Sequence, residues 1–227
     1  NYYGYRDTLN LLGEYNFNLD TKIVFGLENE FDNAKFQKDL PTDYLSSDEA
    51  IYSQFFDFQL RAFKKIYSTI GFRRDDHTTA GAYNTGRITS AYKIDNLSKL
   101  RISYGTGIRF PTLYDYFYGT VITKKEELKP EESKSFDIGY ETIFENINTN
   151  FNISVFKIMY DNALESWESN GWKIKNSKAK IKSKGIEVSF LWKPKRNFKI
   201  GLNYNYNDTY DGADCDDPDK SSITCID

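Results

Sequence analysis

The sequence predicts an all-β protein, and three observations favour an antiparallel up-and-down transmembrane β-barrel of which about ten strands are present. Apolar and polar residues alternate along most of the chain. The connections between the alternating segments are short and long in turn. Aromatic residues make up 17% of the 227 residues. Alternation indicates strands with two unlike faces, and sorted connections indicate a meander with two unlike ends.

The alternating segments, taken in chain order, give the expected strands. Their apolar positions are Leu9, Leu11, Gly13, Tyr15, Phe17 and Leu19; Ile23, Phe25 and Leu27; Phe56, Phe58, Leu60 and Ala62; Ile66, Ile70 and Phe72; Ile88, Tyr92 and Ile94; Leu100, Ile102 and Tyr104; Phe136, Ile138 and Tyr140; Ile186, Val188, Phe190 and Trp192; and Phe198, Ile200, Leu202, Tyr204 and Tyr206. In the segment from Phe151 to Tyr160 the apolar parity changes between Val155 and Phe156. Either a β-bulge or a strand that rises out of its apolar layer would produce that change. No segment predicts a helix.

The connections differ in length. Short ones are expected at Asp20-Thr21, Lys64-Lys65, Asp95 to Ser98, Glu145 to Asn148 and Pro194 to Arg196. Longer ones are expected at about Asp32 to Ala50, Asp75 to Ala82, Pro111 to Glu132, Asn162 to Ser177, and Asp208 to the end. All five prolines fall in these connections, as expected because proline has no backbone donor for a sheet.

Sorted connections favour an outer-membrane barrel, which has short periplasmic turns and longer extracellular loops. The apolar parity, rich in Phe and Tyr, would face lipid, and the polar parity would face a wet or plugged lumen. A soluble antiparallel sheet with one buried face would show the same alternation, but it has no reason to sort its connections by length.

Composition excludes other classes of protein. The mean hydropathy is -0.65 and no apolar run exceeds three residues, so the sequence contains neither a transmembrane helix nor the apolar core of a signal peptide. The charge is balanced, with 30 Lys and Arg against 33 Asp and Glu, which argues against a nucleic-acid partner. The aromatic content argues against disorder. The only methionine is Met159, and we expect the sequence to be part of a longer protein.

Two segments resemble a known family. SYGTGIRFPTLYD (103–115), followed by LKPEESKSFDIGYE (128–141), resembles the barrel signature of TonB-dependent outer-membrane receptors, most closely the vitamin B12 and siderophore branches. GFRRDDH (71–77) and the stretch from Asn176 through KAKIKSKGIEVSF (178–190) are similar to further strands of that family. Gly105 and Gly107 share the inward parity and would leave space in the lumen.

The resemblance implies that residues 1–227 are part of one barrel domain of about 22 strands, closed by a plug domain that lies elsewhere with the remaining strands. It implies a protein of the bacterial outer membrane that takes up cobalamin or a ferric siderophore. Its partners would be outer-membrane lipid, the ligand, and the TonB complex, which it would contact through an N-terminal segment outside this sequence. The alternatives are a passive porin and a soluble carbohydrate-binding β-sheet protein.

Aromatic and cationic residues in or near the loops are the ligand-binding candidates. The aromatic side chains would supply contact area at small entropic cost, or would pack one loop on another. Arg109 would meet anionic ligand groups or pair with a lumen carboxylate, and for Arg101 pairing with Asp137 or Glu141 is the stronger expectation. The candidates are Arg109, Tyr114, Tyr116, Tyr118, Trp167 and Trp172.

No catalytic residues or cofactors are assigned. Asp75, Asp76 and His77 form the only acid-base group at a strand end, without a second carboxylate pair, so we expect no enzyme. Cys215 and Cys225 are candidates for a disulfide in an oxidising compartment. The same segment carries weak candidates for calcium ligands. Their spacing lacks the glycine-punctuated pattern of a dedicated calcium loop, so solvated charge is the default interpretation. The candidates are Asp214, Asp216, Asp217 and Asp219, in a group that also contains Asp208 and Asp211.

Overall fold

The computed structural model describes residues 2–37, 44–117, 127–168 and 172–211. Within these ranges, ten strands form one antiparallel sheet in the order β1-β2-β3-β4-β5-β6-β7-β8-β11-β12. These strands are β1 (Tyr2–Asn18), β2 (Thr21–Gln37), β3 (Tyr44–Ala62), β4 (Ile66–His77), β5 (Gly81–Lys93), β6 (Ser98–Arg109), β7 (Glu131–Phe144), β8 (Thr149–Asp161), β11 (Ile181–Lys195) and β12 (Phe198–Asp211). The order confirms the predicted up-and-down meander.

Three smaller elements complete the described chain. A hairpin of β9 (Leu164–Glu168) and β10 (Trp172–Asn176) forms a separate two-stranded sheet between β8 and β11. The short helix α1 (Leu113–Phe117) follows β6, and the 3-10 turn η2 (Glu145–Ile147) joins β7 to β8. The sequence predicted none of them. Among the described residues no helix is long and apolar enough to cross a membrane.

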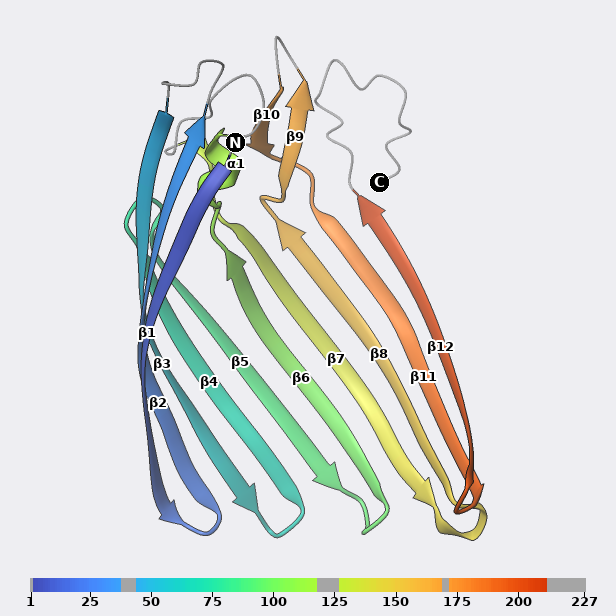
Figure 1. Cartoon of the computed structure of the whole chain (residues 1–227). Helices are drawn as coiled ribbons and strands as arrows, with labels where there is room; N and C mark the ends of the chain where they lie inside the picture. The colour runs from blue at the N-terminus through green and yellow to red at the C-terminus, as the bar shows by residue number, and fades with distance from the viewer. Residues whose placement is uncertain (1, 38–43, 118–126, 169–171, 212–227) are drawn as a thin grey trace.

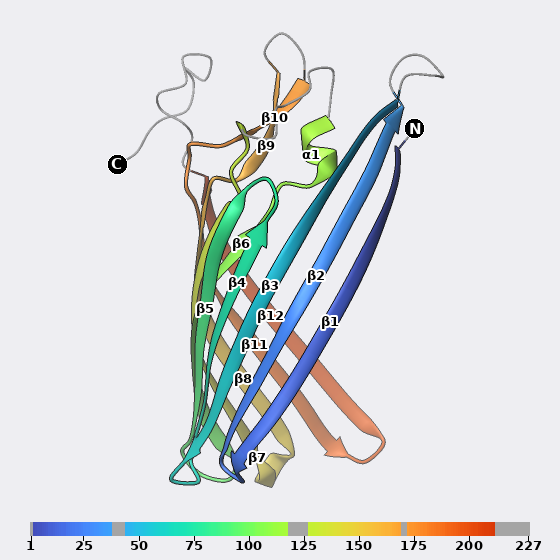
Figure 2. The same cartoon turned by 90° about the vertical axis from the view of Figure 1, so that its left-hand side faces the viewer.

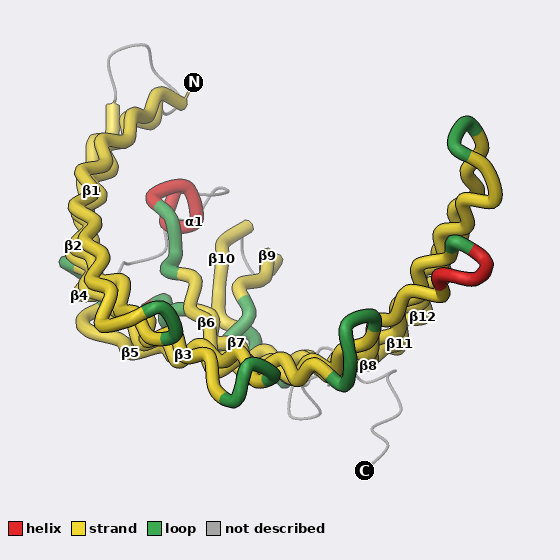
Figure 3. The backbone as a smooth tube through the Cα atoms, turned by 90° about the horizontal axis from the view of Figure 1, so that it is seen from below, coloured by secondary structure: helices red, strands yellow, loops and turns green. Residues whose placement is uncertain are grey.

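The sheet curves into an open trough rather than lying flat. Figure 1 and Figure 2 show the tilted strands side by side, with α1 and the β9-β10 hairpin at one end and tight turns at the other. Seen along the strands in Figure 3, α1 and the hairpin lie inside the curve. The ends of the sheet therefore differ as the connection lengths predicted, and the end with α1 corresponds to the extracellular side of a barrel.

Register places the apolar residues on the convex face. One row of paired residues runs from Tyr15 on β1 to Phe136 on β7 through Ile23, Phe58, Ile70, Ile88 and Tyr104. The side chains of this face are exposed; Leu9 has an exposed fraction of 73% and Leu202 of 64%. The opposite parity contains Ala34, which is buried against Leu113 and Tyr116 of α1 inside the curve. The predicted division into an apolar and a polar face is therefore confirmed.

The small core lies inside the trough at the α1 end. It consists of Ala34, Leu113, Tyr116, Leu128 and Ile174, so it joins β2, α1, the segment before β7, and β10. Phe36 and Phe117 extend it, with ring centroids 4.4 Å apart. This core holds the connections against the wall of the sheet. Elsewhere the strands rely on their ladders and on side-chain pairs across strands.

Four of the five short connections fall where the sequence places them, and the fifth is shifted because β11 continues to Lys195. Two long connections are shorter than expected. β2 and β3 extend into the predicted loop of residues 32–50, with Asp32 paired to Glu49, so only residues 38–43 separate them. The predicted loop at Asp75 to Ala82 is also wrong, because β4 continues to His77 and β5 begins at Gly81. Strands that leave the membrane can be polar on both faces, which hid them from a search for alternation.

Two local predictions receive a clear outcome. β8 pairs without a register shift along both neighbours from Thr149 to Tyr160, so the parity change at Val155 marks a strand that leaves the apolar layer, and the β-bulge alternative is wrong. Pro194 lies inside β11, next to a register shift between Trp192 and Lys195. Its assignment to a connection is therefore wrong, although the register shift is a usual place for a strand proline.

Candidate functional site

The polar residues of the concave face form paired networks across strands. Arg73 Nε lies 2.7 Å from Asp75 Oδ1, and Arg73 Nη2 lies 2.8 Å from Glu28 Oε1. Ser53 Oγ donates to Asp75 Oδ1 at 2.6 Å. Asp75 and Ser53 are buried although both are polar. The guanidinium of Arg73 compensates the Asp75 carboxylate, and this group links β2, β3 and β4 through charge-assisted hydrogen bonds.

Further arginine pairs follow around the trough. Arg6 binds Asp32 with two nitrogens at 2.7 Å, and Arg87 Nη2 donates to Asp57 at 2.8 Å. Ser103 donates to Asp137. All of these residues face the concave side. Arg6 with Asp32 and Ser103 with Asp137 join adjacent strands. Arg87 on β5 reaches across β4 to Asp57 on β3. The concave wall therefore satisfies most of its own charges, and a ligand would have to compete with them for an arginine.

Arg101 and Arg109 both have carboxylate partners. Arg101 Nε lies 2.6 Å from Glu141 Oε1 in an ion pair without hydrogen-bond geometry, which confirms one of the two partners predicted for Arg101. Arg109 Nη1 donates to Glu131 Oε2 at 2.7 Å, and Arg109 Nη2 lies 3.6 Å from Asp115 Oδ2. The side chain of Arg109 is nevertheless 51% exposed, so one side of its guanidinium remains accessible.

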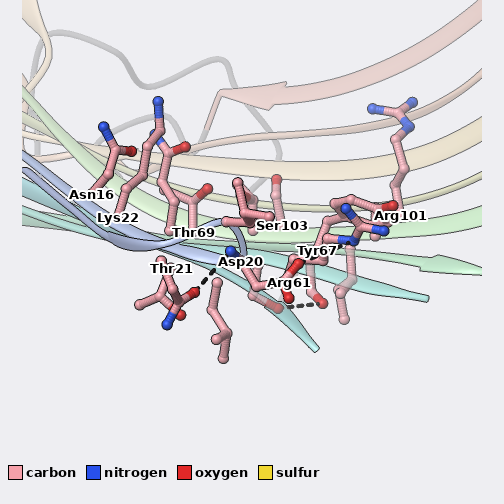
Figure 4. Close-up of a pocket in the computed structure, with 18 of the residues that line it drawn as sticks. Asn16, Asp20, Thr21, Lys22, Arg61, Tyr67, Thr69, Arg101 and Ser103 are labelled. Carbon is pink, nitrogen blue, oxygen red and sulfur yellow. Dashed lines mark hydrogen bonds and ion pairs between the residues drawn. The ribbon is translucent and has the colours of Figure 1, made fainter. Parts of the chain in front are cut away.

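A cavity of about 680 Å³ opens on the concave side near the short turns. Figure 4 shows Lys22, Arg61, Thr69, Arg101 and Ser103 around it. Lys22 pairs with Glu14 at 3.0 Å and Arg61 with Asp20 at 3.4 Å, so the lining cations already have carboxylate partners. The cavity offers hydroxyls and charged groups in mixed order, which suits contact with another polar protein surface more than capture of one small ion.

The loop assembly at the α1 end is held by a few specific bonds. The carboxylate of Asp115 accepts from the backbone nitrogen and the hydroxyl of Thr112, at 2.8 and 2.9 Å, and closes the first turn of α1. Asn176 donates to the carbonyl oxygens of Lys129 and Asn162 and accepts from the Lys129 amide, each at 2.7 or 2.8 Å. Asn176 thereby fastens the base of the hairpin to the segment before β7.

Glu131 connects this assembly to Arg109. Its Oε2 accepts from Arg109, and its Oε1 accepts from the backbone nitrogen of Leu164 at 2.7 Å. The sequence analysis assigned no role to Glu131 or to the Asn176 side chain. Both residues lie within the quoted family segments. For Glu131 the available signal was its position after Pro130 at the start of β7. Asn176, the last residue of β10, carried no such signal.

The predicted ligand-binding residues do not all lie in one place. Tyr114 is half exposed and lines a hollow of about 350 Å³ together with Tyr5, Arg6 and Asp32. Tyr116, on the same helix, has an exposed fraction of 1% and packs in the loop core, which fits the alternative of loop on loop packing. Arg109 approaches this helix through Asp115. The structure therefore brings Arg109, Tyr114 and Tyr116 to one end of the trough, with only two of them accessible.

Other candidates fall outside what the structure describes. Trp167 and Trp172 lie on β9 and β10, where Trp167 pairs with Lys173 and Trp172 with Glu168, but their side chains are not described. Tyr118 lies outside the described residues, as do the disulfide candidates and the four calcium candidates. These are Cys215, Cys225, Asp214, Asp216, Asp217 and Asp219.

Asp75, Asp76 and His77 at the end of β4 do not form a catalytic group. Asp75 and His77 face the inside, whereas Asp76 has the opposite parity, so the three side chains do not converge. His77 Nδ1 accepts the backbone N–H groups of Thr79 and Ala80 at 3.1 Å, and its ring stacks on Phe110 with centroids 4.6 Å apart. His77 Nε2 lies 3.7 Å from Glu49 Oε2. Among the described residues no group of three His, Cys, Asp or Glu side chains is arranged to hold a metal ion.

Comparison with known proteins gives consistent matches. The family model described as TonB dependent receptor-like, beta-barrel matches residues 1–223. The vitamin B12 transporter BtuB of Photobacterium profundum is 36% identical over 66 residues, which are 29% of this chain and 11% of that protein. The vitamin B12 transporter BtuB of Vibrio vulnificus is 28% identical over 100 residues, 44% of this chain and 15% of that protein.

Solved structures share the fold at low identity. The siderophore receptor PirA from Pseudomonas aeruginosa superimposes with a TM-score of 0.77 and 18% identity, over 91% of this chain and 41% of that chain. The copper transporter OprC gives a TM-score of 0.72 and 18% identity, over 92% of this chain and 38% of that chain. The chain thus spans less than half the length of the proteins it resembles.

Proposed function

The chain belongs to the TonB-dependent receptor-like β-barrel family, and we propose that the complete protein is a receptor for energy-coupled uptake of a scarce, bulky ligand, cobalamin or a ferric siderophore. The family consists of receptors and transporters. We therefore propose no catalytic role for this chain. The ligand classes are those named for its relatives, the BtuB proteins and PirA.

The protein is located in the bacterial outer membrane, since the barrels of this family are outer-membrane proteins. This location excludes the interpretation as a soluble carbohydrate-binding protein. It also explains the exposed convex face, because a soluble protein rarely leaves so large an apolar surface in water. Phe198, Ile200, Leu202, Tyr204 and Tyr206 on β12 are all more than 40% exposed in the chain alone.

The observation that carries the proposal is the concave wall. It is polar along its length, it compensates its own charges, and it carries the assembly of α1 and the β9-β10 hairpin at the end with the longer connections. Such a wall is suited to hold a polar plug while the loops above it take a ligand. A passive porin would need a wide water-filled lumen instead.

Completion of the barrel requires further strands. β1 and β12 each pair on one side only among the described residues, and open edges are not tolerated in hydrocarbon. We propose that residues 1–227 form part of one barrel domain, and that the remaining strands, a plug and a segment that contacts TonB lie elsewhere in the protein. The cavity near the short turns would then contact the plug.

The binding surface proposed for the ligand begins at Arg109 and Tyr114. Both are about half exposed, and both lie at the end of the trough that faces the cell exterior. Tyr118, Trp167 and Trp172 remain candidates for the same surface. A disulfide between Cys215 and Cys225 and a calcium site at the neighbouring aspartates stay predictions.

Two measurements on the full-length protein test the proposal. Titration with cobalamin, a panel of ferric siderophores and Cu²⁺ should give one ligand with a dissociation constant of about 1 μM or lower. Uptake of that ligand by cells should stop when a protonophore removes the proton-motive force. Arg109→Ala should weaken binding, whereas Arg74→Ala, a matched arginine on the convex face of β4, should leave it unchanged.

The passive channel is the competing outcome. If the full-length protein binds no ligand of the panel tightly, and if small solutes enter at a rate that the protonophore does not change, the receptor proposal is wrong and a porin replaces it.

A further inference from the structure

Four lysines form a cluster on the convex face of β7, β8 and β11. Lys134 pairs with Met159, which pairs with Lys182, in one row of the sheet. In the adjacent row Phe136 pairs with Lys157, which pairs with Lys184. Lys134, Lys157, Lys182 and Lys184 therefore surround Met159 on three neighbouring strands, and all four are exposed. We call them the lysine cluster.

The cluster lies at the edge of the apolar surface. The next rows toward the short turns are Ile138, Val155, Ile186 and Tyr206, and then Tyr140, Ile153, Val188 and Tyr204. These rows belong to the lipid-facing parity. The cluster is at the end of the strands that carries α1 and the hairpin, so it lies at the level of the outer-leaflet headgroups.

The cluster keeps an excess of positive charge among the described residues. Glu132 and Asp161 lie in the next row on the same face, and Asp161 already pairs with Lys180 at 3.1 Å. Lys157 and Lys184 stand directly opposite each other on neighbouring strands, an arrangement that like charges disfavour. Lys184 lies 3.3 Å from Asp208, but no ion pair within the described ranges includes Lys134, Lys157 or Lys182.

The convex face of β3 to β6 carries little charge at the corresponding level. The outward residues just above the apolar layer on β3 to β6 are mostly uncharged, with one arginine among them. They are Gln54, Arg74, Asn84 and Thr106. The positive charge is thus concentrated on β7, β8 and β11 rather than spread evenly around the wall, which argues against a general preference for lysine at this depth.

We propose that the lysine cluster docks the phosphate groups of an anionic glycolipid of the outer leaflet, whose acyl chains lie along the apolar rows beside it. Adjacent strands are about 4.8 Å apart, so the cluster spans roughly 10 Å across three strands. One phosphate is too small to reach all four lysines, so the fitting headgroup carries two. Binding of this kind places a cation pair on each phosphate and relieves the repulsion between Lys157 and Lys184.

The test compares lipid binding by variants of the complete outer-membrane protein. One variant replaces all four cluster lysines with glutamine. The matched control replaces four exposed lysines at the short-turn end with glutamine and so removes the same charge. The control positions are Lys65, Lys193, Lys195 and Lys199. Native mass spectrometry titrates each protein with diphosphoryl lipid A and with the same lipid after removal of its phosphates.

The wild type and the control should bind diphosphoryl lipid A equally, and the cluster variant should bind it on the order of 1000-fold more weakly, at about fivefold for each of the four lysines. All three should bind the dephosphorylated lipid equally weakly. A cluster variant that binds like the wild type would overturn the proposal, as would a wild type that does not distinguish the two lipids.

Two further variants keep the outcome interpretable. Replacing the four lysines with arginine keeps the charge and should keep the binding. If the glutamine variant does not reach its heat-resistant folded form, Lys157→Gln alone should still reduce affinity by about fivefold, because each lysine at a membrane surface contributes about 1 kcal/mol. An unchanged affinity in the folded single variant would contradict the assignment.

Discussion

The side chains on the two faces of the sheet are stabilised in different ways. On the convex face the apolar side chains stay exposed in the chain alone, as Leu9 and Leu202 do, and lipid must cover them. On the concave face the charged side chains find partners within the chain, as Arg73 and Asp75 do at 2.7 Å. The comparison shows that one face depends on the membrane for its stability, whereas the other depends on register between strands.

The largest expected effect comes from a charge on the convex face. Leu202 is the central member of the apolar series on β12, so Leu202→Arg should destabilise the full-length protein by about 2 to 4 kcal/mol if it lies near the bilayer midplane. Unfolding in urea, followed by the heat-dependent shift in electrophoretic mobility, measures the change.

Asn203→Arg is the matched control, because Asn203 follows Leu202 on β12 and faces the trough. It should change stability by less than about 0.5 kcal/mol. If both variants assemble normally with unchanged stability, the assignment of the faces is wrong.

A smaller effect on stability is expected at Gly185 on the concave face, where neighbouring atoms leave no room for a side chain. A Cβ atom at Gly185 would lie 2.6 Å from Cζ of Phe156 and would also meet the backbone oxygen of Tyr206. Gly185→Ala should therefore cost about 1 to 3 kcal/mol, as overpacking does. Gly105→Ala is the control, because its nearest neighbour would be 3.6 Å away and the sequence analysis placed this glycine beside open lumen space. Equal urea midpoints for the two variants would show that the wall adjusts freely.

Removal of the Arg73 guanidinium from the concave face should reduce stability somewhat less than Gly185→Ala does. Arg73→Met leaves the buried carboxylate of Asp75 with only Ser53 as a donor among its described partners. We expect a loss of about 1 to 2 kcal/mol, because the Arg73 side chain is itself about one third exposed. Arg74→Met, on the next residue but the convex face, should have little effect. A larger loss for Arg74→Met than for Arg73→Met would reverse the comparison of the two faces.

The sequence was sufficient to predict those features that depend on single side chains and not on contacts between them. Whether a side chain prefers lipid or water depends on that side chain, so the strands, their parity and the short turns could be predicted. Glu141 was one of the two partners predicted for Arg101, but most partners could not be predicted. The pairing of Arg73 with Glu28, for example, depends on which strands adjoin and in which register. Helix α1 was missed for a related reason. Its five residues have too little periodicity to detect, and the helix depends on the Thr112 cap and on packing against Ala34.

The site was predicted only in part for the same physical reason. Tyr114 and Tyr116 look alike in the sequence, yet one is half exposed and the other has an exposed fraction of 1%. Their difference arises from the core around Tyr116, to which Ala34 and Ile174 contribute from segments far away in the chain. The loop between β4 and β5 was overestimated because His77 stabilises the short turn through its ring nitrogen, a contact that the Asp-Asp-His pattern does not reveal.

The smallest expected effect lies in a turn outside both faces. Asp95 Oδ1 accepts the backbone N–H groups of Leu97 and Ser98, each at 2.7 Å, and the bond from Leu97 is the main cause that lowers the pKa of Asp95 below its ordinary value of 3.8. A carboxyl group with a lowered folded-state pKa contributes stability above its unfolded pKa, and this contribution is lost as the pH falls through the folded pKa. Asp95→Asn should therefore be slightly less stable than the wild type at a pH well above 3.8, and the difference should vanish well below it. Urea midpoints measured across that range test this, and a difference that stays constant throughout would show that the charge of Asp95 does not stabilise the turn.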